Sequence, residues 1–290
     1  MTPEEPLFVA LTLDVDPDAN RPEPGRPDAV SPGGEARWDA CLEGLACLTE
    51  RLEQRGLPAT FFWEGRALQQ AERRRPDLLE RLRENPHLEH GTHGMEHEDF
   101  AGEDTGVRPG AAETRDVIER VGAAYREAFG AAPLGFRAPY CRLTSDLIRA
   151  LQEAGYRYDA SRTVRASGTE PLMPRLLSKP GLWEAPLCRS RDGDGLPISG
   201  YLWQLLEGSR QAGEYVEMAR ALRGPCAGGL LQIALHPWHL VVSAEGKPLE
   251  RDGPALVGRV LDGVAASDGV QTTTVGGYLE RWTAMSYNHR

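Results

Sequence analysis

Four of the seven histidines in this chain lie within eleven residues, and this cluster is the first place where the sequence suggests chemistry. They are His87, His90, His93 and His97. The last two stand four residues apart, so on a helical turn both imidazoles would share one face and could bind one metal ion. Histidine pairs with this spacing also occur at surfaces and helix caps, so the spacing alone leaves both interpretations open.

The same segment, His93-Gly94-Met95-Glu96-His97, also matches the inverted zinc-peptidase pattern H-x-x-E-H. In that interpretation Glu96 is the general base, and a distant glutamate is needed as the third ligand. The pattern gives no role to the acids near the N-terminus. A zinc peptidase is therefore kept as an alternative function.

Two aspartates, Asp14 and Asp16, end the first expected strand. Alternation along a strand directs both side chains to the same side. Two neighbouring carboxylates are costly to desolvate together unless they share a cation or a proton. A metal ion held by Asp16 and the two histidines would remove that cost and leave Asp14 as a base. The alternative is that one aspartate only starts a turn before Pro17.

Two further strand ends carry candidate groups. Arg137 could orient a carboxylate through a pair of hydrogen bonds, and the N–H of Tyr140, three residues later, could face a developing oxyanion. His236 ends a buried apolar run, which suits a general acid, although a structural histidine fits that position equally well. Each of these signals is weak when taken alone.

Strand-like apolar runs alternate with segments of helical periodicity along the whole chain. The expected strands are Leu7–Val15, Ala59–Trp63, Leu88–Thr92, Leu134–Arg137, Tyr156–Ala160, Leu182–Leu187, Leu230–His236 and Val270–Val275. The expected helices cover residues 38–52, 73–84, 117–129, 144–154, 210–223, 254–267 and 276–284. Such alternation is typical of parallel strands with crossover helices. We therefore expect an α/β protein, a single distorted (β/α) barrel of seven to eight parallel strands over residues 1–290.

Three irregular segments interrupt this alternation, at residues 17–36, 161–181 and 189–200. In α/β barrels the loops that follow strands form the carboxyl-terminal face, where active sites lie. A cover formed by the first, proline-rich segment would favour a small substrate over a polymer. The alternative is a tether without a function.

The composition limits the class of protein. Of the 290 residues, 40% are hydrophobic and 26% are charged, which is typical of a globular protein. A net charge of −10 argues against a partner such as nucleic acid or an anionic membrane. Five scattered cysteines without a C-x-x-C pair, no recognisable signal peptide and no 18-residue apolar run predict a cytoplasmic protein.

Taken together and in this order, the motifs resemble those of the metal-dependent polysaccharide deacetylases, the NodB-homology carbohydrate esterases of family 4. The Asp-x-Asp, His-x-x-x-His and Arg-x-Pro-Tyr motifs and the late histidine span residues 12–236. The chain is similar to atypical, intracellular members. The resemblance implies one divalent metal ion, with zinc as the default and iron, cobalt or nickel compatible with the same ligand types.

The resemblance also implies a role for each matched residue. Asp14 would be the general base and Arg137 would orient it. The amide of Tyr140 would line the oxyanion site, and His236 would protonate the leaving amine. The implied metal ligands are Asp16, His93 and His97.

One departure from the family concerns the acyl pocket. The family usually has a leucine two residues before its late histidine, where this chain has Ala234. Because that leucine helps to wall the acyl group, we expect an altered pocket here, with Trp183 and Trp238 as further substrate contacts. The family's tryptophan-and-acid motif is not recognisable, so the sequence offers no account of how His236 is tuned.

The resemblance thus implies a metal-dependent deacetylase. Its expected partner is a small molecule, an N-acylated amino sugar or a glycoconjugate, and N-acetyl is the expected acyl group. A formamide- or allantoin-type C–N hydrolase and an inactive sugar-binding barrel are further alternatives on the same fold.

Overall fold

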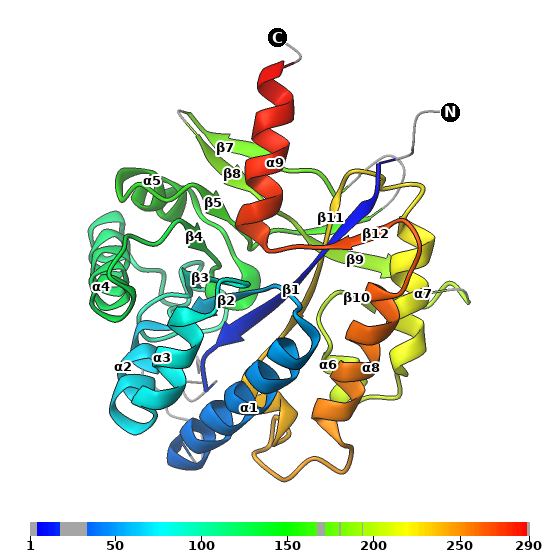
Figure 1. The fold of residues 1–290 in the computed structure, drawn as a ribbon. Coiled ribbons are helices and arrows are strands. Elements are labelled where there is room, and N and C mark those ends of the chain that lie inside the picture. The colour runs from blue at the N-terminus through cyan, green and yellow to red at the C-terminus, as the bar shows by residue number, and fades with distance from the viewer. Residues whose placement is uncertain (1–4, 18–33, 167–171, 180, 193, 289–290) are drawn as a thin grey trace.

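The computed structural model describes residues 5–17, 34–166, 172–179, 181–192 and 194–288. Its centre is a curled sheet whose strands run parallel to their neighbours, apart from an antiparallel pair at one edge (Figure 1). In spatial order the strands are β11 (Leu230–Leu235), β1 (Leu7–Val15), β2 (Ala59–Trp63), β3 (Leu88–Thr92), β4 (Gly135–Phe136), β5 (Tyr158–Asp159), β8 (Leu182–Glu184) and β7 (Arg175–Ser178). A short strand, β12 (Val270–Thr272), pairs with the beginning of β1. The expected α/β fold with a barrel-like sheet is confirmed.

Helices cover the outer face of the sheet and one of its ends (Figure 1). They are α1 (Gly34–Arg55), α2 (Gly65–Arg74), α3 (Pro76–Glu84), α4 (Ala111–Phe129), α5 (Ser145–Glu153), α6 (Trp203–Leu206), α7 (Ala212–Leu222), α8 (Gly253–Ala265) and α9 (Val275–Asn288). Two short 3-10 turns, η1 (Pro139–Cys141) and η2 (Pro237–Leu240), follow β4 and β11.

β1 shows how a strand divides its side chains between two environments. Its odd-numbered residues pack in the main hydrophobic core against α1, α7 and α8. Phe8 and Ala10 face the interior of the curled sheet and join a smaller cluster with side chains of α9. Asp14 and Asp16 lie farther along the same inner face. The interior therefore changes from apolar to polar toward the carboxyl ends of the strands.

The parallel register brings several strand ends to one edge of the sheet. A continuous row of paired positions crosses six strands through Val15, Trp63, Thr92, Phe136, Asp159 and Glu184. The residue after each paired position lies one step nearer that edge. Three of these next residues are Asp16, His93 and Arg137. The register thus brings three motifs that are distant in sequence into one group.

The expected strand over Leu182–Leu187 is wrong, because it is two strands in two sheets. β8 ends at Glu184, and the next strand begins only after Pro186, which has no N–H to donate to a ladder. The second sheet consists of β6 (Thr163–Arg165), β9 (Leu187–Arg191) and β10 (Pro197–Ser199). β6 and β9 pair in parallel, and β9 and β10 pair antiparallel. This sheet occupies segments in which the sequence analysis expected loops.

The helix expected over residues 73–84 is also divided. Arg75 has an extended φ of −141° and separates α2 from α3, as expected for a residue before a proline. Most of the proline-rich segment, residues 18–33, lies outside the described residues. In the described parts of the chain, no helix is long and apolar enough to cross a bilayer.

Close packing of α1 on η2 generates a stability prediction. A Cβ atom at Gly44 of α1 would lie 1.9 Å from the carbonyl oxygen of Pro237. We expect Gly44→Ala to lower the free energy of unfolding by about 1–3 kcal/mol, as overpacking in a core does. Gly213 of α7 has no atom within 4 Å of such a Cβ, so Gly213→Ala should be neutral or stabilising by up to about 1 kcal/mol. Urea unfolding of both variants checks this, and equal losses would contradict it.

Candidate metal centre and catalytic cleft

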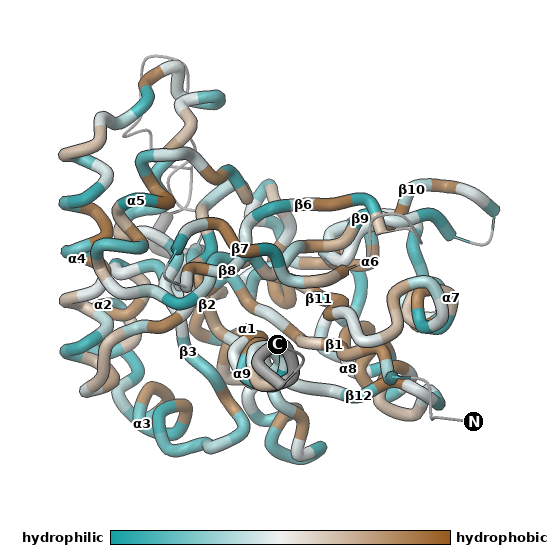
Figure 2. Tube along the Cα trace, turned by 90° about the horizontal axis from the view of Figure 1, so that it is seen from above, coloured by the Kyte–Doolittle hydropathy of each residue, from teal (hydrophilic) through white to brown (hydrophobic). Residues whose placement is uncertain are grey.

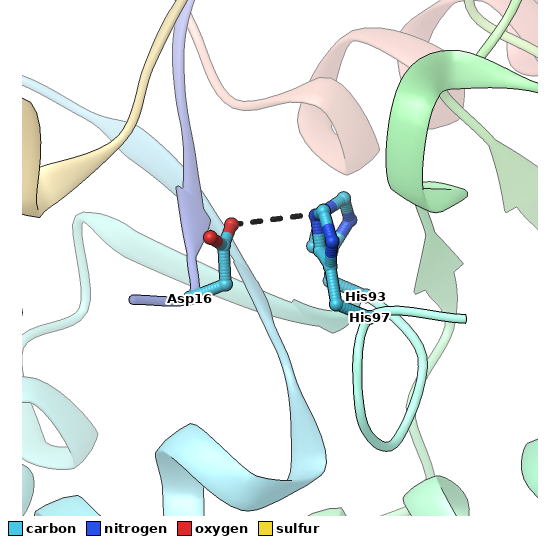
Figure 3. A group of neighbouring side chains, drawn as sticks. All are labelled: Asp16, His93 and His97. Atoms are coloured by element: carbon cyan, nitrogen blue, oxygen red, sulfur yellow. Dashed lines mark ion pairs between the residues drawn. The ribbon is translucent and has the colours of Figure 1, made fainter. Parts of the chain in front are cut away.

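Asp16, His93 and His97 converge at the carboxyl edge of the sheet (Figure 3). One ligand-type atom from each residue lies within 4.8 Å of the others, and all three side chains are buried. Asp16 directly follows β1, and His93 directly follows β3. This is the donor set, two imidazoles and one carboxylate, that the sequence singled out.

The expected helical turn between the two histidines is wrong. The segment from His93 to His97 is a loop, with Gly94 at φ 78° and His97 at φ 61°. Positive φ values at both positions are incompatible with a right-handed helix. The Glu98 carboxylate closes the loop by accepting hydrogen bonds from two of its backbone N–H groups, at 2.9 and 3.0 Å. The imidazoles approach one another because the loop turns back.

The hydrogen bonds of His93 determine which of its ring nitrogens faces Asp16 and His97. Nδ1 donates to the carbonyl oxygen of Arg137 at 2.8 Å, because a carbonyl can only accept. Nε2 therefore carries a lone pair, is buried without a hydrogen-bond partner and lies 3.7 Å from Asp16 Oδ2. Burial lowers the pKa of His93, which favours the neutral form that a ligand needs. A buried lone pair facing a carboxylate fits a cation between them.

His97 contacts the segment that follows β4. Its Nδ1 lies 3.0 Å from the Tyr140 hydroxyl. Burial, and then the neighbouring His93 and His236, lower the pKa of His97 well below its usual range, so its imidazole is neutral. Tyr140 and Cys141, like His97, have positive φ values, 59° and 56°. Three residues other than glycine thus have a left-handed backbone conformation at or beside the three candidate ligands.

Asp14 is held by a buried ion pair with Arg137. The guanidinium donates to Asp14 Oδ1 at 2.7 Å and to the Thr12 hydroxyl at 3.0 Å, both through Nη1. Its Nε donates to the carbonyl oxygen of Ala160 at 3.0 Å. Burial alone would raise the pKa of Asp14, but the nearby Arg137 guanidinium, with His93 and His236, lowers it below its usual value. Asp14 is therefore an anion that the protein orients.

Three residues beside the site were not predicted from the sequence, and two of them support the ion pair of Asp14 and Arg137. Gln232 accepts from Arg137 Nη2 at 2.6 Å, and the Tyr201 hydroxyl donates to the second oxygen of Asp14. Gln232 could have been found, because it is polar within an otherwise apolar strand. It lies four residues before His236, so alternation along the strand directs both side chains to the same face. Tyr201 lies in an irregular segment without such a signal.

Glu64, the third missed residue, directly follows β2 and is buried. Burial raises the pKa of Glu64 well above its usual range, and the Asp16 carboxylate raises it further, which favours the protonated form. An acid directly after a buried strand is the signal that singled out Asp16, and it could have singled out Glu64 as well.

His236 lies at the end of β11 with its Nε2 3.7 Å from Asp16 Oδ2. Its ring stacks on Trp238 at 5.5 Å between centroids, and Trp203 meets its edge at 6.1 Å. Burial lowers the pKa of His236 to about 3, so the resting imidazole is neutral. Within the described residues, Nδ1 has no hydrogen-bond partner.

A cleft of about 410 Å³ opens over these groups. It is lined by Asp14, His93, His97, Tyr140, Cys141, Thr163, Leu187, Arg189, Ser199, Tyr201, Trp203, His236 and Trp238. Trp238 is thus in the cleft, but two other expected substrate contacts are not in its lining. Trp183 packs against the interior cluster beside α9, and Ala234 is fully buried on β11, where it pairs with Tyr201.

A sequence model of the polysaccharide deacetylase family matches residues 39–158, the segment that contains His93, His97 and Arg137. No significant match was found among curated proteins. The fold itself is similar to several solved structures. A Mycobacterium smegmatis protein described as a polysaccharide deacetylase has 20% identity and a TM-score of 0.70, over 99% of this chain and 93% of that one.

Two further structures share the fold. Puue allantoinase has 15% identity and a TM-score of 0.69, over 98% of this chain and 92% of that one. A family 4 carbohydrate esterase from Streptomyces lividans, in complex with acetate, has 17% identity and a TM-score of 0.51, over 91% of both chains. The fold and the family match define the class, an α/β barrel of NodB-homology type. The chain is similar to the polysaccharide deacetylase family over residues 39–158, and it shares its fold with solved structures described as members of that family.

The geometry of the three candidate ligands generates a prediction. We expect the wild-type chain to bind about one Zn²⁺ per chain in a calorimetric titration. Asp16→Ala and His97→Ala should each weaken Zn²⁺ binding more than about tenfold. Loss of a residue that only hydrogen-bonds to a metal ligand already lowers metal affinity by about that factor. His87→Ala, which removes an exposed histidine, should bind like the wild type. Full metal content in His97→Ala would contradict the assignment.

Proposed function

We propose that this chain is a metal-dependent deacetylase that hydrolyses the amide of an N-acetylated amino sugar or a related small amine. One observation carries the proposal: the oriented anion Asp14 lies in the same cleft as two of the candidate metal ligands, His93 and His97. The match of residues 39–158 to the polysaccharide deacetylase family model supports the reaction class.

The proposed site divides hydrolysis among separate groups. A divalent ion held by Asp16, His93 and His97 would supply Lewis acidity, which polarises the acyl oxygen and acidifies water. Asp14 takes the proton of the attacking water, because its pKa is lowered and both its oxygens are fixed by hydrogen bonds. The amide hydrogen of Tyr140 is proposed to face the developing oxyanion.

The leaving nitrogen must receive a proton before it departs as an amine. His236 lines the cleft, and its resting form is neutral because burial lowers its pKa to about 3. We infer that His236 first takes up the proton that Asp14 has accepted and then delivers it to the nitrogen. Trp238 and Trp203 pack against the imidazole and limit its orientations.

An allantoin-type C–N hydrolase is the second candidate. It is favoured by the similarity to Puue allantoinase, which extends over 98% of this chain with a TM-score of 0.69. The same base, acid and metal ligands would serve that reaction, so the difference between the two candidates lies in the substrate.

The test is amine release from N-acetylglucosamine and N-formylglucosamine, and ring opening of allantoin to allantoate, by the zinc-loaded protein. Chelation with EDTA should abolish turnover, and added Zn²⁺ should restore it. Asp14→Asn should lower kcat by at least about 100-fold while metal content stays near one ion per chain, because loss of a general base typically costs 10²–10⁴-fold. Retained turnover in Asp14→Asn would contradict the role of the base.

The zinc-peptidase alternative is tested by Glu96→Gln. Glu96 is exposed and does not line the cleft, so this substitution should change amide hydrolysis by less than about twofold. Under the peptidase alternative the same variant would lose its general base and nearly all activity. An assay of the wild type and this variant on one N-acetylated substrate separates the two functions.

A further inference from the structure

The second sheet has one buried face and one open face. Val164, Cys188 and Ile198 lie on its buried face and pack in the main hydrophobic core. The opposite face carries Arg165 on β6 and Arg189 on β9, both exposed. Figure 2 shows β6, β9 and β10 beside one another, on the side of the molecule away from α2 and α4. The open face is therefore polar and cationic.

Arg165 and Arg189 occupy directly paired positions on β6 and β9, so the two side chains leave the same face of the sheet as neighbours. Like charges at paired positions repel one another. Among the described residues neither guanidinium forms an ion pair, whereas the neighbouring Arg210 is neutralised by Asp192 and Glu214. Within the described residues these two neighbouring arginines thus lack acidic partners, in a chain whose net charge is −10.

A cavity of about 790 Å³ adjoins this sheet and is lined by residues of both of its faces and by residues near α6 and α7. Arg165, Arg189 and Arg191 contribute to its lining, as does the ion-paired Arg210. The cavity adjoins the catalytic cleft, because three residues line both: Thr163, Arg189 and Ser199. Arg189 therefore stands where the two spaces meet. A molecule whose amide lies beside Asp14 could extend past Arg189 into the cationic space.

We propose that Arg165 and Arg189 bind an anionic group, a phosphate or a carboxylate, on the amine portion of the substrate. This inference rests on the proposed function and narrows its substrate class to acidic N-acyl amines. Guanidinium groups match the planar oxygens of such anions through paired, charge-assisted hydrogen bonds. An anion between them would also remove the repulsion between the two side chains.

The test compares three amides in the zinc-loaded full chain: N-acetylglucosamine, its 6-phosphate and N-acetylmuramic acid. We expect kcat/KM for at least one acidic amide to exceed that of the neutral amide by at least about tenfold, the gain of one charge-assisted contact. Arg165→Gln and Arg189→Gln should each remove that advantage, mainly by raising KM for the acidic amide. Arg83→Gln, at an exposed position on α3, is the matched control and should change nothing.

A binding measurement separates failure of this inference from failure of the proposed function. Calorimetry measures the affinity of the same proteins for the amines glucosamine, glucosamine 6-phosphate and muramic acid. Tighter binding of an acidic amine that is lost in Arg189→Gln supports the anion site even if no amide is hydrolysed. Equal binding and equal hydrolysis of neutral and acidic compounds would overturn the anion site and leave the deacetylase intact. An effect of Arg83→Gln as large as that of Arg189→Gln would also overturn it.

Discussion

The buried guanidinium of Arg137 connects the strands on which the site is built. It follows β4 and hydrogen-bonds to the Asp14 carboxylate, the Ala160 carbonyl and the Gln232 side chain. Gln232 in turn donates to the carbonyl of Ala185 beyond β8. Arg137 thus links β4 to β1, β5 and β11 directly, and to the segment after β8 through Gln232. Removing one partner of a buried ion pair typically costs about 3–5 kcal/mol, so the position of the base and the stability of this edge are coupled.

The sequence predicts the parts of the fold that repeat a simple rule. β1, β2 and β3 begin and end at the predicted residues. β1 and β2 are mostly apolar runs, whereas β3 includes Glu89 and His90. Alternation along β1 also predicts that Asp14 and Asp16 share one face of the strand. Convergence of the motifs follows from a single premise, that parallel strands end at one edge.

What the sequence does not predict depends on contacts between distant segments. The four-residue spacing of His93 and His97 fits a helical turn. In the structure the segment is a loop in which His97 has a positive φ, a conformation that the residue type histidine does not predict. Tyr201 reaches Asp14 only because its segment pairs beside β11, a tertiary event without a local pattern. The second sheet is built from strands of three to five residues, too short for a periodicity to be recognised.

The left-handed backbone at His97, Tyr140 and Cys141 has an evolutionary consequence. Left-handed backbone by itself costs each of these residues about 1–2 kcal/mol relative to glycine. In a lineage that no longer needed the site, this backbone strain would favour glycine or asparagine at the three positions. The residues that relatives carry at these three positions therefore record whether selection still acts on the site.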